Sequence, residues 1–441
     1  MKQADTLLHP AWLVPGEPHG VVRAGYSLAL RSGRILEVLP RNAAEARYRA
    51  SEVIELPRHA LLPGMINAHT HAAMSLLRGL AHDIPLDQWL KHHIWPAERR
   101  HLDRDFVADG VRLAAAEMLC NGITCFNDMY YHPEITAEVA RAAGMRCVVG
   151  IRVLPPHRVW ALEPEDCLEG GLSLHDRWQG DPLVHTSLAA HMPLALNGNT
   201  MRSLGIVSRE RNLRLHMHVH ETVAGIETFR SRHGVRPLQR LQRLGLLGPR
   251  LLAVHLVHLE DAELEAVAAA GAHVVHCPRS NLLLASGFCP VARLQAAGVN
   301  VALGTDSAAS NDNLDLFGEM RTAALLGKGV AGDPTAVPAA TALHMATLGG
   351  ARALGLERET GSLVADKAAD CIAVDLGAIA ARPCNNVLTQ LVYASAGAQV
   401  TDVWIQGRRL VRERTLTSMD PEAIAARVQR WAQRIRPHAS G

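Results

Sequence analysis

Eight short apolar segments alternate with helix-like stretches between about residue 59 and residue 326. Strands that alternate with helices are typical of parallel sheets, because each strand needs a crossover before the next one can lie beside it. Eight such units predict an α/β fold, a closed (β/α)8 barrel of the TIM type. An open doubly wound sheet is the alternative, but no glycine-rich phosphate-binding turn follows the first strand. The predicted strands cover residues 61–69, 123–129, 147–154, 184–191, 213–218, 252–255, 273–276 and 301–306, and the predicted helices cover residues 109–120, 137–143, 238–244, 261–270, 291–297 and 316–326.

Both ends of the chain carry a strand pattern instead. Residues 26–31 alternate in polarity, Ser32-Gly33 forms a turn, and residues 34–39 continue as the hairpin partner. Short strand-like runs return at 370–374 and 403–405. We therefore expect a small β-sandwich domain that is built from both chain ends. The N-terminal part of this domain is predicted at residues 1–58, and the barrel at residues 59–358. Residues 359–441 are predicted to complete the β-sandwich domain and to end in a helix that begins at Asp420-Pro421.

Size and composition exclude several classes of protein. A chain of 441 residues suits a large barrel with an accessory domain. It is 48% hydrophobic with a formal net charge of +2, which predicts a packed core and gives no basic patch for nucleic acid. The sequence shows neither a signal peptide nor an apolar stretch that could span a membrane, so we expect no membrane association. The eight cysteines include no Cys-x-x-Cys motif, which predicts reduced thiols in a cytoplasmic protein.

Histidine and acidic residues stand at the ends of the predicted strands. His69 and His71 are two residues apart, so on a strand both imidazoles face the same interior. His218 ends the fifth predicted strand, His255 the sixth and Asp306 the eighth. Strand ends converge on one rim of a barrel, and imidazoles with a carboxylate suit Zn²⁺, with Fe²⁺ or Mn²⁺ as alternatives. The sequence therefore predicts a metal site, where an ion can lower the pKa of water from about 15.7 towards about 7.

These residues belong to longer motifs that resemble two related families. Pro63-Gly-Met-Ile-Asn-Ala-His-Thr-His, His218-Val-His-Glu, His276-Cys-Pro-Arg-Ser-Asn and Gly304-Thr-Asp together resemble the amidohydrolase superfamily. His71-Ala-Ala-Met-Ser-Leu-Leu-Arg-Gly-Leu, Trp95-Pro-Ala-Glu and Gly304-Thr-Asp-Ser-Ala-Ala-Ser-Asn resemble its 5-methylthioadenosine/S-adenosylhomocysteine deaminases, in the branch that includes triazine hydrolases. The resemblance extends from about residue 20 to about residue 415.

The resemblance implies a site with one metal ion per subunit and a set of proton-transferring groups. His255 is implied to hydrogen-bond the attacking water. Glu221 is implied to be the general acid that protonates a ring nitrogen, although a carboxylate at a helix start is the alternative from its position alone. Asp306 is implied to take the proton of the water as well as to bind the ion. The implied metal ligands are His69, His71, His218 and Asp306.

The resemblance also implies a substrate and its contacts. Glu98 would accept hydrogen bonds from a ribose diol, and His191 would contact a purine nucleoside; a helix-start carboxylate and a core histidine are the alternatives. The implied reaction converts 5'-methylthioadenosine, S-adenosylhomocysteine or an adenosine-like nucleoside to the inosine analogue and ammonia. Guanine, pterin or triazine aminohydrolases are the rival functions, and a non-catalytic barrel scaffold is a remote one. Homo-oligomerisation is compatible with the apolar content, although no motif indicates it.

Several positions depart from the family pattern. Ser307 stands where relatives commonly have glycine, and Leu283 where many have lysine. Residues 154–160 are unusual in the region where contacts to the 5' substituent are expected, and either Arg152 or Arg158 could pair with the carboxylate of homocysteine. The departures leave the metal chemistry intact and the 5' substituent open. His276 is interpreted as a residue that contacts the site residues without binding the metal or the substrate. An apolar wall for the purine, or alternatively ordinary loop packing, is expected from Met74, Trp89, Met129, Tyr130 and Tyr131.

Overall fold

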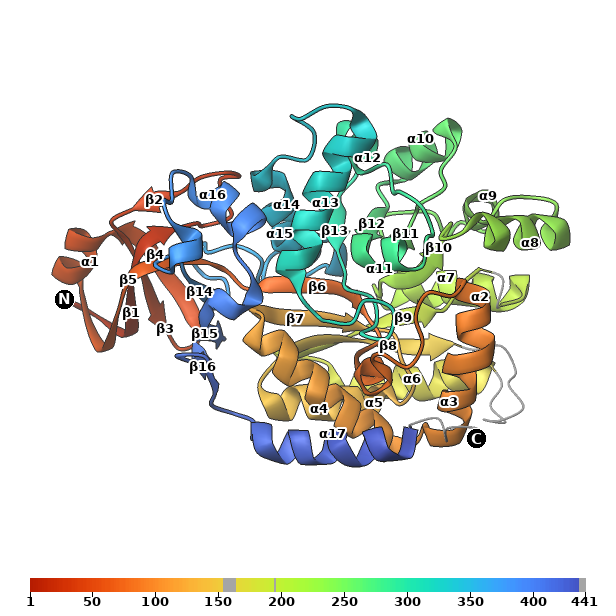
Figure 1. Ribbon diagram of the computed structural model, residues 1–441, viewed down its shortest axis with the longest axis horizontal. Coiled ribbons are helices and arrows are strands. Elements are labelled where there is room, and N and C mark those ends of the chain that lie inside the picture. Colours follow the sequence, from red (N-terminus) through yellow and green to blue (C-terminus); the bar gives the residue numbers. More distant parts are fainter. Residues whose placement is uncertain (154–163, 194–195, 436–441) are drawn as a thin grey trace.

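The computed structural model describes residues 1–153, 164–193 and 196–435. Within these residues, eight parallel strands lie side by side in chain order, as the alternation of strands and helices predicts (Figure 1). The last strand returns to the first, because the backbone N–H of Asp306 donates to the carbonyl of His69 at 3.1 Å. The predicted barrel is therefore confirmed. Its strands are β6 (Met65–Thr70), β7 (Ile123–Asp128), β8 (Arg146–Val153), β9 (Val184–Ala190), β10 (Leu215–Val219), β11 (Leu251–His255), β12 (His273–His276) and β13 (Val301–Leu303).

Helices follow the strands and cover the outside of the barrel (Figure 1). The predicted helix 261–270 shows how the sequence sets their ends: Glu260 and Glu263 form a capping box at its start, and Gly271 ends it with a left-handed φ of 64°. The barrel helices are α4 (Arg104–Cys120), α5 (Pro133–Ala143), α6 (Pro164–Trp178), α7 (Gly198–Glu210), α8 (Val223–His233), α9 (Pro237–Arg243), α10 (Asp261–Ala270), α11 (Pro278–Leu283), α12 (Val291–Ala296), α13 (Leu316–Ala331), α14 (Ala339–Ala346) and α15 (Leu348–Leu354). A further stretch between β6 and α4 contains η1 (Ala72–Leu77), α2 (Leu86–Trp89), η2 (Leu90–Ile94) and α3 (Trp95–His101).

The second sheet joins the two ends of the chain, as predicted. Its β14 (Cys371–Asp375) lies antiparallel to β5 (Tyr48–Pro63), with Cys371 opposite Pro63. The turn between β3 and β4 contacts the segment just before β14, where the N–H of Ala369 donates a hydrogen bond to the carbonyl of Gly33 at 2.9 Å. The sheet thus folds over a core of its own. Its other strands are β1 (Lys2–Leu13), β2 (Arg23–Ala24), β3 (Tyr26–Arg31), β4 (Arg34–Pro40), β15 (Val400–Ile405), β16 (Arg408–Arg412) and β17 (Thr415–Leu416), and its short helices are α1 (Arg41–Arg47), η3 (Ile379–Ala381), α16 (Val387–Thr389), η4 (Gln390–Ala394) and η5 (Gly397–Gln399).

Gly64 separates the two sheets. The predicted strand 61–69 is wrong in one respect, because residues 61–63 belong to β5 of the second sheet and only β6 belongs to the barrel. A Cβ at Gly64 would lie 2.1 Å from the hydroxyl oxygen of Thr124, so only glycine fits where the chain passes between the sheets. The domain boundaries after residues 58 and 358 remain a prediction.

The terminal helix packs back onto the barrel. Helix α17 (Pro421–Ile435) begins as predicted, with the Asp420 carboxylate accepting from the N–H of Glu422 at 3.0 Å. Trp431 is buried, and its ring meets that of Phe106 on α4 with centroids 5.4 Å apart. Figure 1 shows α17 lying along α4.

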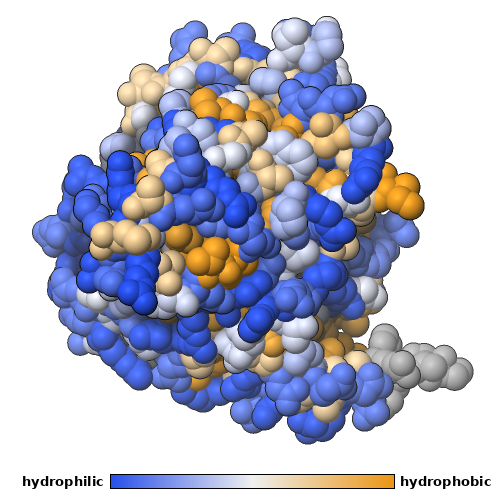
Figure 2. All heavy atoms as spheres, turned by 90° about the vertical axis from the view of Figure 1, so that its left-hand side faces the viewer, coloured by the Kyte–Doolittle hydropathy of each residue, from blue (hydrophilic) through white to orange (hydrophobic). Residues whose placement is uncertain are grey.

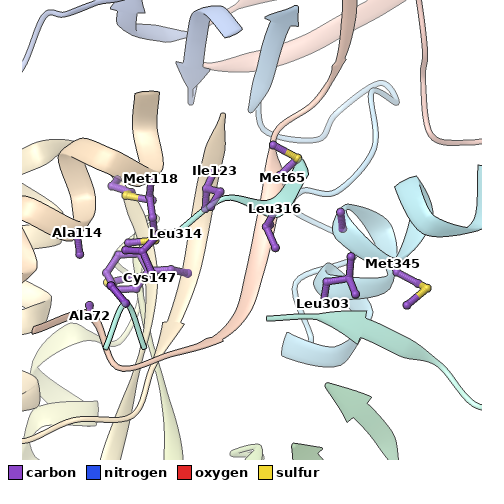
Figure 3. Packing of buried hydrophobic residues seen from close by; sticks show 14 of the residues in the cluster. Met65, Ala72, Ala114, Met118, Ile123, Cys147, Leu303, Leu314, Leu316 and Met345 are labelled. Carbon is purple, nitrogen blue, oxygen red and sulfur yellow. The ribbon is translucent and has the colours of Figure 1, made fainter. Parts of the chain in front are cut away.

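One apolar cluster connects the barrel with its helices. Figure 3 shows side chains of this cluster from β6, β7, β13, α4 and α14. The surface on the side of the second sheet is largely hydrophilic, with small separate apolar areas (Figure 2). None of the helices in the described residues combines the length and the apolar character that crossing a membrane requires.

Candidate metal centre and active site

Four side chains from distant parts of the chain meet at the carboxyl end of the barrel strands. The Nε2 atoms of His69 and His71 each lie 3.3 Å from Oδ1 of Asp306. The Nε2 atom of His218 lies 3.2 Å from that of His69. All four residues are buried, and their ligand atoms lie within 4.8 Å of one another. The structure therefore brings the four predicted ligands together in a group that can hold one metal ion.

The hydrogen bonds behind the cluster prepare two of the imidazoles for a metal. Nδ1 of His71 lies 2.5 Å from the carbonyl of Met129, and Nδ1 of His218 lies 2.6 Å from the carbonyl of His191. A carbonyl only accepts, so Nδ1 of each ring carries the proton and the lone pair of Nε2 faces the cluster. Carbonyl partners of this kind are what metal-binding histidines use to fix their tautomer. The donor set therefore fits a divalent ion.

Burial and mutual charge set the protonation of the cluster. Burial lowers the pKa of His69 to about 4 and holds the pKa of His218 well below its usual range. Burial also lowers the pKa of His71, but the neighbouring Asp306 carboxylate and the Met129 carbonyl outweigh that effect and raise the pKa. Burial raises the pKa of Asp306, but the two neighbouring histidines hold it well below its usual range. The carboxylate is thus ionised, and its negative charge favours a cation in the cluster.

His216 is a supporting residue that sequence reasoning missed. Its Nε2 lies 2.8 Å from Nδ1 of His69, and its side chain is fully buried. The signal was present in the sequence, because His216 and His218 have the same spacing of two residues as His69 and His71. His220, two residues further on, faces the α9 start and the loop after β11, where Nδ1 lies 3.0 Å from the carbonyl of His258.

Glu221 and His255 lie beside the cluster. Oε2 of Glu221 is 3.9 Å from Nε2 of His255, and both residues line the same cavity as Asp306. Burial raises the pKa of Glu221, although the nearby histidines oppose the shift. A carboxyl that keeps its proton to higher pH is suited to act as an acid. His255 and Asp306 both have left-handed backbone, with φ of 78° and 59°, a strained conformation that is common where side chains are aimed at an active site.

Glu98 lies in the same cavity, on α3. Its Oε1 accepts a hydrogen bond from the hydroxyl of Tyr130 at 2.7 Å. Burial raises the pKa of Glu98, and the positive charge of Arg152 opposes the shift. Arg152 is the last residue but one of β8, and its guanidinium lies 3.8 Å from the centre of the Tyr131 ring. His191, which follows β9, lines the cavity as well.

The cavity around the cluster continues into a wider one of about 790 Å³. Both are lined by Leu86, Leu90 and Met192 in addition to His218 and Glu221. The space is large enough for a substrate that extends beyond one purine ring. Of the residues predicted to form an apolar wall, Met74, Trp89, Met129 and Tyr130 line the cavity at the cluster.

The positions that depart from the family pattern, and His276, lie in different parts of the structure. Leu283 lines the wider cavity and Ser307 the part near the cluster. His276 is buried at the end of β12, and its Nδ1 has no hydrogen-bond partner among the described residues. Arg158 and the rest of the segment 154–160 lie outside the described residues.

Comparison with known proteins shows the family of the chain. Residues 60–410 match the amidohydrolase family. The sequence is 43% identical over 431 residues, 98% of each chain, to the 5-methylthioadenosine/S-adenosylhomocysteine deaminase of Teredinibacter turnerae. The structure matches an adenosine deaminase of Xanthomonas campestris with bound zinc at a TM-score of 0.97 and 44% identity, over 99% of each chain. An atrazine chlorohydrolase of Arthrobacter aurescens complexed with zinc matches at a TM-score of 0.90 over 97% of this chain and 100% of that chain, but at 21% identity it shares the fold alone.

Proposed function

The chain belongs to the amidohydrolase family, and from this premise we propose that it is a metal-dependent hydrolase that deaminates an adenine nucleoside. The products are the inosine analogue and ammonia. The candidate substrates are 5'-methylthioadenosine, S-adenosylhomocysteine and adenosine, after which the two relatives from Teredinibacter turnerae and Xanthomonas campestris are named. One observation carries the proposal: three members of the metal-ligand cluster line one cavity together with the Glu221 carboxyl and the Glu98 carboxylate.

We propose zinc as the ion, one per subunit, with iron(II) or manganese(II) as alternatives. Three imidazoles and one carboxylate suit zinc, and the Xanthomonas campestris structure contains it. When bound, the ion would lower the pKa of water from about 15.7 towards about 7, so that water is an effective nucleophile at neutral pH. The ligands are His69, His71, His218 and Asp306.

The chemistry that the protein supplies is proton transfer. Water adds to C6 of the purine while the carboxyl of Glu221 donates its proton to N1. Asp306 takes the proton that the water loses and passes it to the amino group. The C6–N bond then breaks and ammonia leaves, while the new hydroxyl on C6 returns its proton to Glu221 and becomes the carbonyl of the inosine analogue. The Nε2 atom of His255 points towards the Glu221 carboxyl. From there the ring donates a hydrogen bond to the attacking oxygen.

Glu98 and His191 would hold the rest of the nucleoside. A carboxylate offers two acceptor oxygens, which match the two hydroxyls of a ribose, and Tyr130 keeps Glu98 in place. His191 lies against His218, with ring centres 4.9 Å apart, where it can meet the purine. Arg152 lies near Glu98, where it can meet a negatively charged 5' substituent.

An ammonia-release screen tests the proposal. The purified protein is supplied with zinc and given adenosine, 5'-methylthioadenosine, S-adenosylhomocysteine, guanine, a pterin and a triazine. We expect turnover of at least one adenosine derivative, loss of turnover after zinc is removed by a chelator, and recovery when zinc is returned. A zinc content near zero after purification with zinc would instead favour a non-catalytic scaffold.

Glu98 separates the nucleoside function from its rivals. Guanine, pterins and triazines have no ribose diol, so Glu98→Ala should spare their turnover. For adenosine we expect kcat/KM to fall by about 100-fold, because two hydrogen bonds to a charged group are lost. Unchanged kcat/KM for adenosine would rule out the proposed ribose contact.

We infer a cytoplasmic location from the predicted reduced thiols, and we expect a small-molecule nucleoside as the partner of the site. Homo-oligomerisation remains a prediction that the mass of the native protein in solution would test.

A further inference from the structure

One motif of the sequence supplies no metal ligand and no proposed contact to substrate. His276-Cys-Pro-Arg-Ser-Asn ends β12 and begins α11. Within it, Ser280 and Asn281 are consecutive polar residues with exposed fractions of 0% and 1%. Buried polar side chains normally have hydrogen-bond partners, and the partners of these two lie in the active site.

Ser280 contacts the carboxylate of Asp306. Its hydroxyl donates to Oδ2 at 2.6 Å, while Oδ1 of the same carboxylate faces His69 and His71. The hydroxyl of Ser310 is a second, longer donor to Oδ2, at 3.2 Å. The two oxygens of Asp306 are therefore in different environments, and Ser280 is the shorter of the two donors that bind the oxygen facing away from the metal cluster.

Asn281 contacts the imidazole of His255. Its amide nitrogen Nδ2 lies 3.0 Å from Nδ1 of the ring. An amide nitrogen only donates, so Nδ1 is the acceptor and the ring proton is on Nε2. Nε2 is the atom that faces Glu221, at 3.9 Å from Oε2. Asn281 thus turns the N–H of His255 towards the reaction centre.

The start of α11, which carries both residues, is itself anchored to α13 and to the loop before it. The backbone N–H of Arg279 donates to Glu319 Oε2 at 3.2 Å, and its guanidinium donates to Asn313 Oδ1 at 2.5 Å. Because Ser280 and Asn281 are adjacent, one fixed helix contacts groups that come from β11 and from the loop after β13.

We propose that Ser280 and Asn281 are positioning residues for the deamination, and this inference rests on the proposed function. Ser280 fixes the orientation of the Asp306 carboxylate that receives the proton of the water. Asn281 fixes the tautomer of His255 so that the ring donates a hydrogen bond to the attacking oxygen. Both act through another residue, and neither touches the substrate.

Asn281→Asp tests the tautomer. The side chain keeps its shape, but a carboxylate can only accept, so it draws a proton to Nδ1 of His255 and no longer holds the tautomer whose single N–H is on Nε2. We expect kcat to fall by about 10- to 100-fold, the size of effect seen for outer partners of active-site histidines, with KM within about threefold and zinc content unchanged. Wild-type kcat with zinc bound would overturn the role of Asn281. If this variant does not fold, Asn281→Ala replaces it, with the same expected loss of kcat and the same overturning result.

Ser280→Ala and Ser280→Thr test the orientation of Asp306. The alanine variant should lose zinc to a chelator about 10- to 100-fold faster than the wild type and lose kcat to a similar extent, whereas threonine, which keeps the hydroxyl, should restore both. Equal behaviour of the two variants would overturn the role of Ser280. Ser286→Ala is the matched control, because its buried hydroxyl on the same segment has no hydrogen-bond partner among the described residues.

The two proposals fail in different ways. A wild-type protein that deaminates no adenosine derivative contradicts the proposed substrate, and the chelator measurement on the Ser280 variants still decides the positioning of Asp306. A wild-type protein that deaminates adenosine, with variants indistinguishable from Ser286→Ala, contradicts the positioning role alone.

Discussion

The hydroxyl of Tyr130 is the only neutral donor that the described residues offer to the Glu98 carboxylate, at 2.7 Å. Tyr130→Phe removes this hydrogen bond, so the Glu98 side chain is less well fixed and its contact with the ribose should weaken. We expect KM for adenosine to rise about 10-fold with kcat little changed, since a hydrogen bond to a charged group contributes about 1.5 kcal/mol or more. Steady-state kinetics measures both.

The matched substrate for this variant is 2',3'-dideoxyadenosine, which lacks the diol. Its KM should be the same for the wild type and for Tyr130→Phe. An equal rise in KM for both nucleosides would show that Tyr130 acts on the cavity in general and not through Glu98.

Glu319 gives the protein a pH-dependent stability. It is fully buried on α13, and burial raises its pKa to about 8, although Asn311 and the backbone of Arg279 donate hydrogen bonds to it. The carboxyl binds its proton more tightly in the folded protein than in the unfolded chain. Its contribution to the free energy of unfolding is therefore complete below about pH 4.5 and is lost as the pH rises to about 8. Glu319→Gln cannot ionise, so we expect thermal unfolding temperatures that fall less between pH 5 and pH 8 than those of the wild type.

A control for the pH effect is Glu422→Gln, on the exposed start of α17. Its stability should follow the wild-type pH dependence. If Glu319→Gln also follows it, the buried carboxyl is not the source of the effect.

Single residues show where sequence reasoning reaches its limit. The histidines at strand ends could be selected because alternation on a strand tells which side chains face the interior. What those side chains contact could not be predicted, since His69 meets His216 across 147 residues and Asp306 meets Ser280 across 26. The spacing of residues along a strand predicts which face of the strand a side chain is on. Its hydrogen-bond partners depend on how distant elements pack against each other.

Elements were predictable where their burial pattern was strong. All eight barrel strands were found, because each contributes a run of buried apolar residues. The predicted helices do not include α6, α7, α8, α11, α14 and α15. The buried face of α8 consists of Ile226 and Phe229, which is too sparse for an apolar stripe, and that of α7 includes small or polar residues. The break at Gly64 was missed because both strands that meet there are apolar.

Gly304 tests the contact that closes the barrel. A Cβ at this position, just after β13, would lie 2.9 Å from both Cβ and the carbonyl oxygen of His69 on β6. In Gly304→Ala the two strands must move apart, which displaces a predicted metal ligand. We expect zinc content and kcat to fall at least 10-fold and the free energy of unfolding to fall by about 1–3 kcal/mol. Metal analysis and urea denaturation measure these effects.

Gly248→Ala is the comparison for that variant. A Cβ there meets no atom within 4 Å, so zinc content and activity should stay at the wild-type level. Full zinc occupancy in Gly304→Ala would mean that the barrel accommodates the methyl group without moving His69.

At the scale of the whole molecule, a buried ion pair joins the barrel to the second sheet. Arg146 begins β8, and its Nε and Nη2 atoms lie 3.0 and 2.9 Å from Oδ2 of Asp370, the residue before β14. The side chains are 1% and 0% exposed. Asp370 also accepts from the N–H of Gln406, in the turn between β15 and β16. Three distant segments thus meet at the amino end of the barrel, away from the metal cluster.

Asp370→Asn leaves the charge of Arg146 buried without a counter-ion. Loss of one partner from a buried pair typically costs about 3–5 kcal/mol, so we expect a decrease of that order in the free energy of unfolding. The kcat of the folded protein should stay within about twofold, because the pair lies at the opposite end of the strands from the site. Arg58→Ala breaks the exposed pair with Asp375, whose arginine side chain is 59% exposed, and should cost about 1 kcal/mol or less. Equal losses of stability in the two variants would mean that the buried pair does not hold the barrel and the second sheet together.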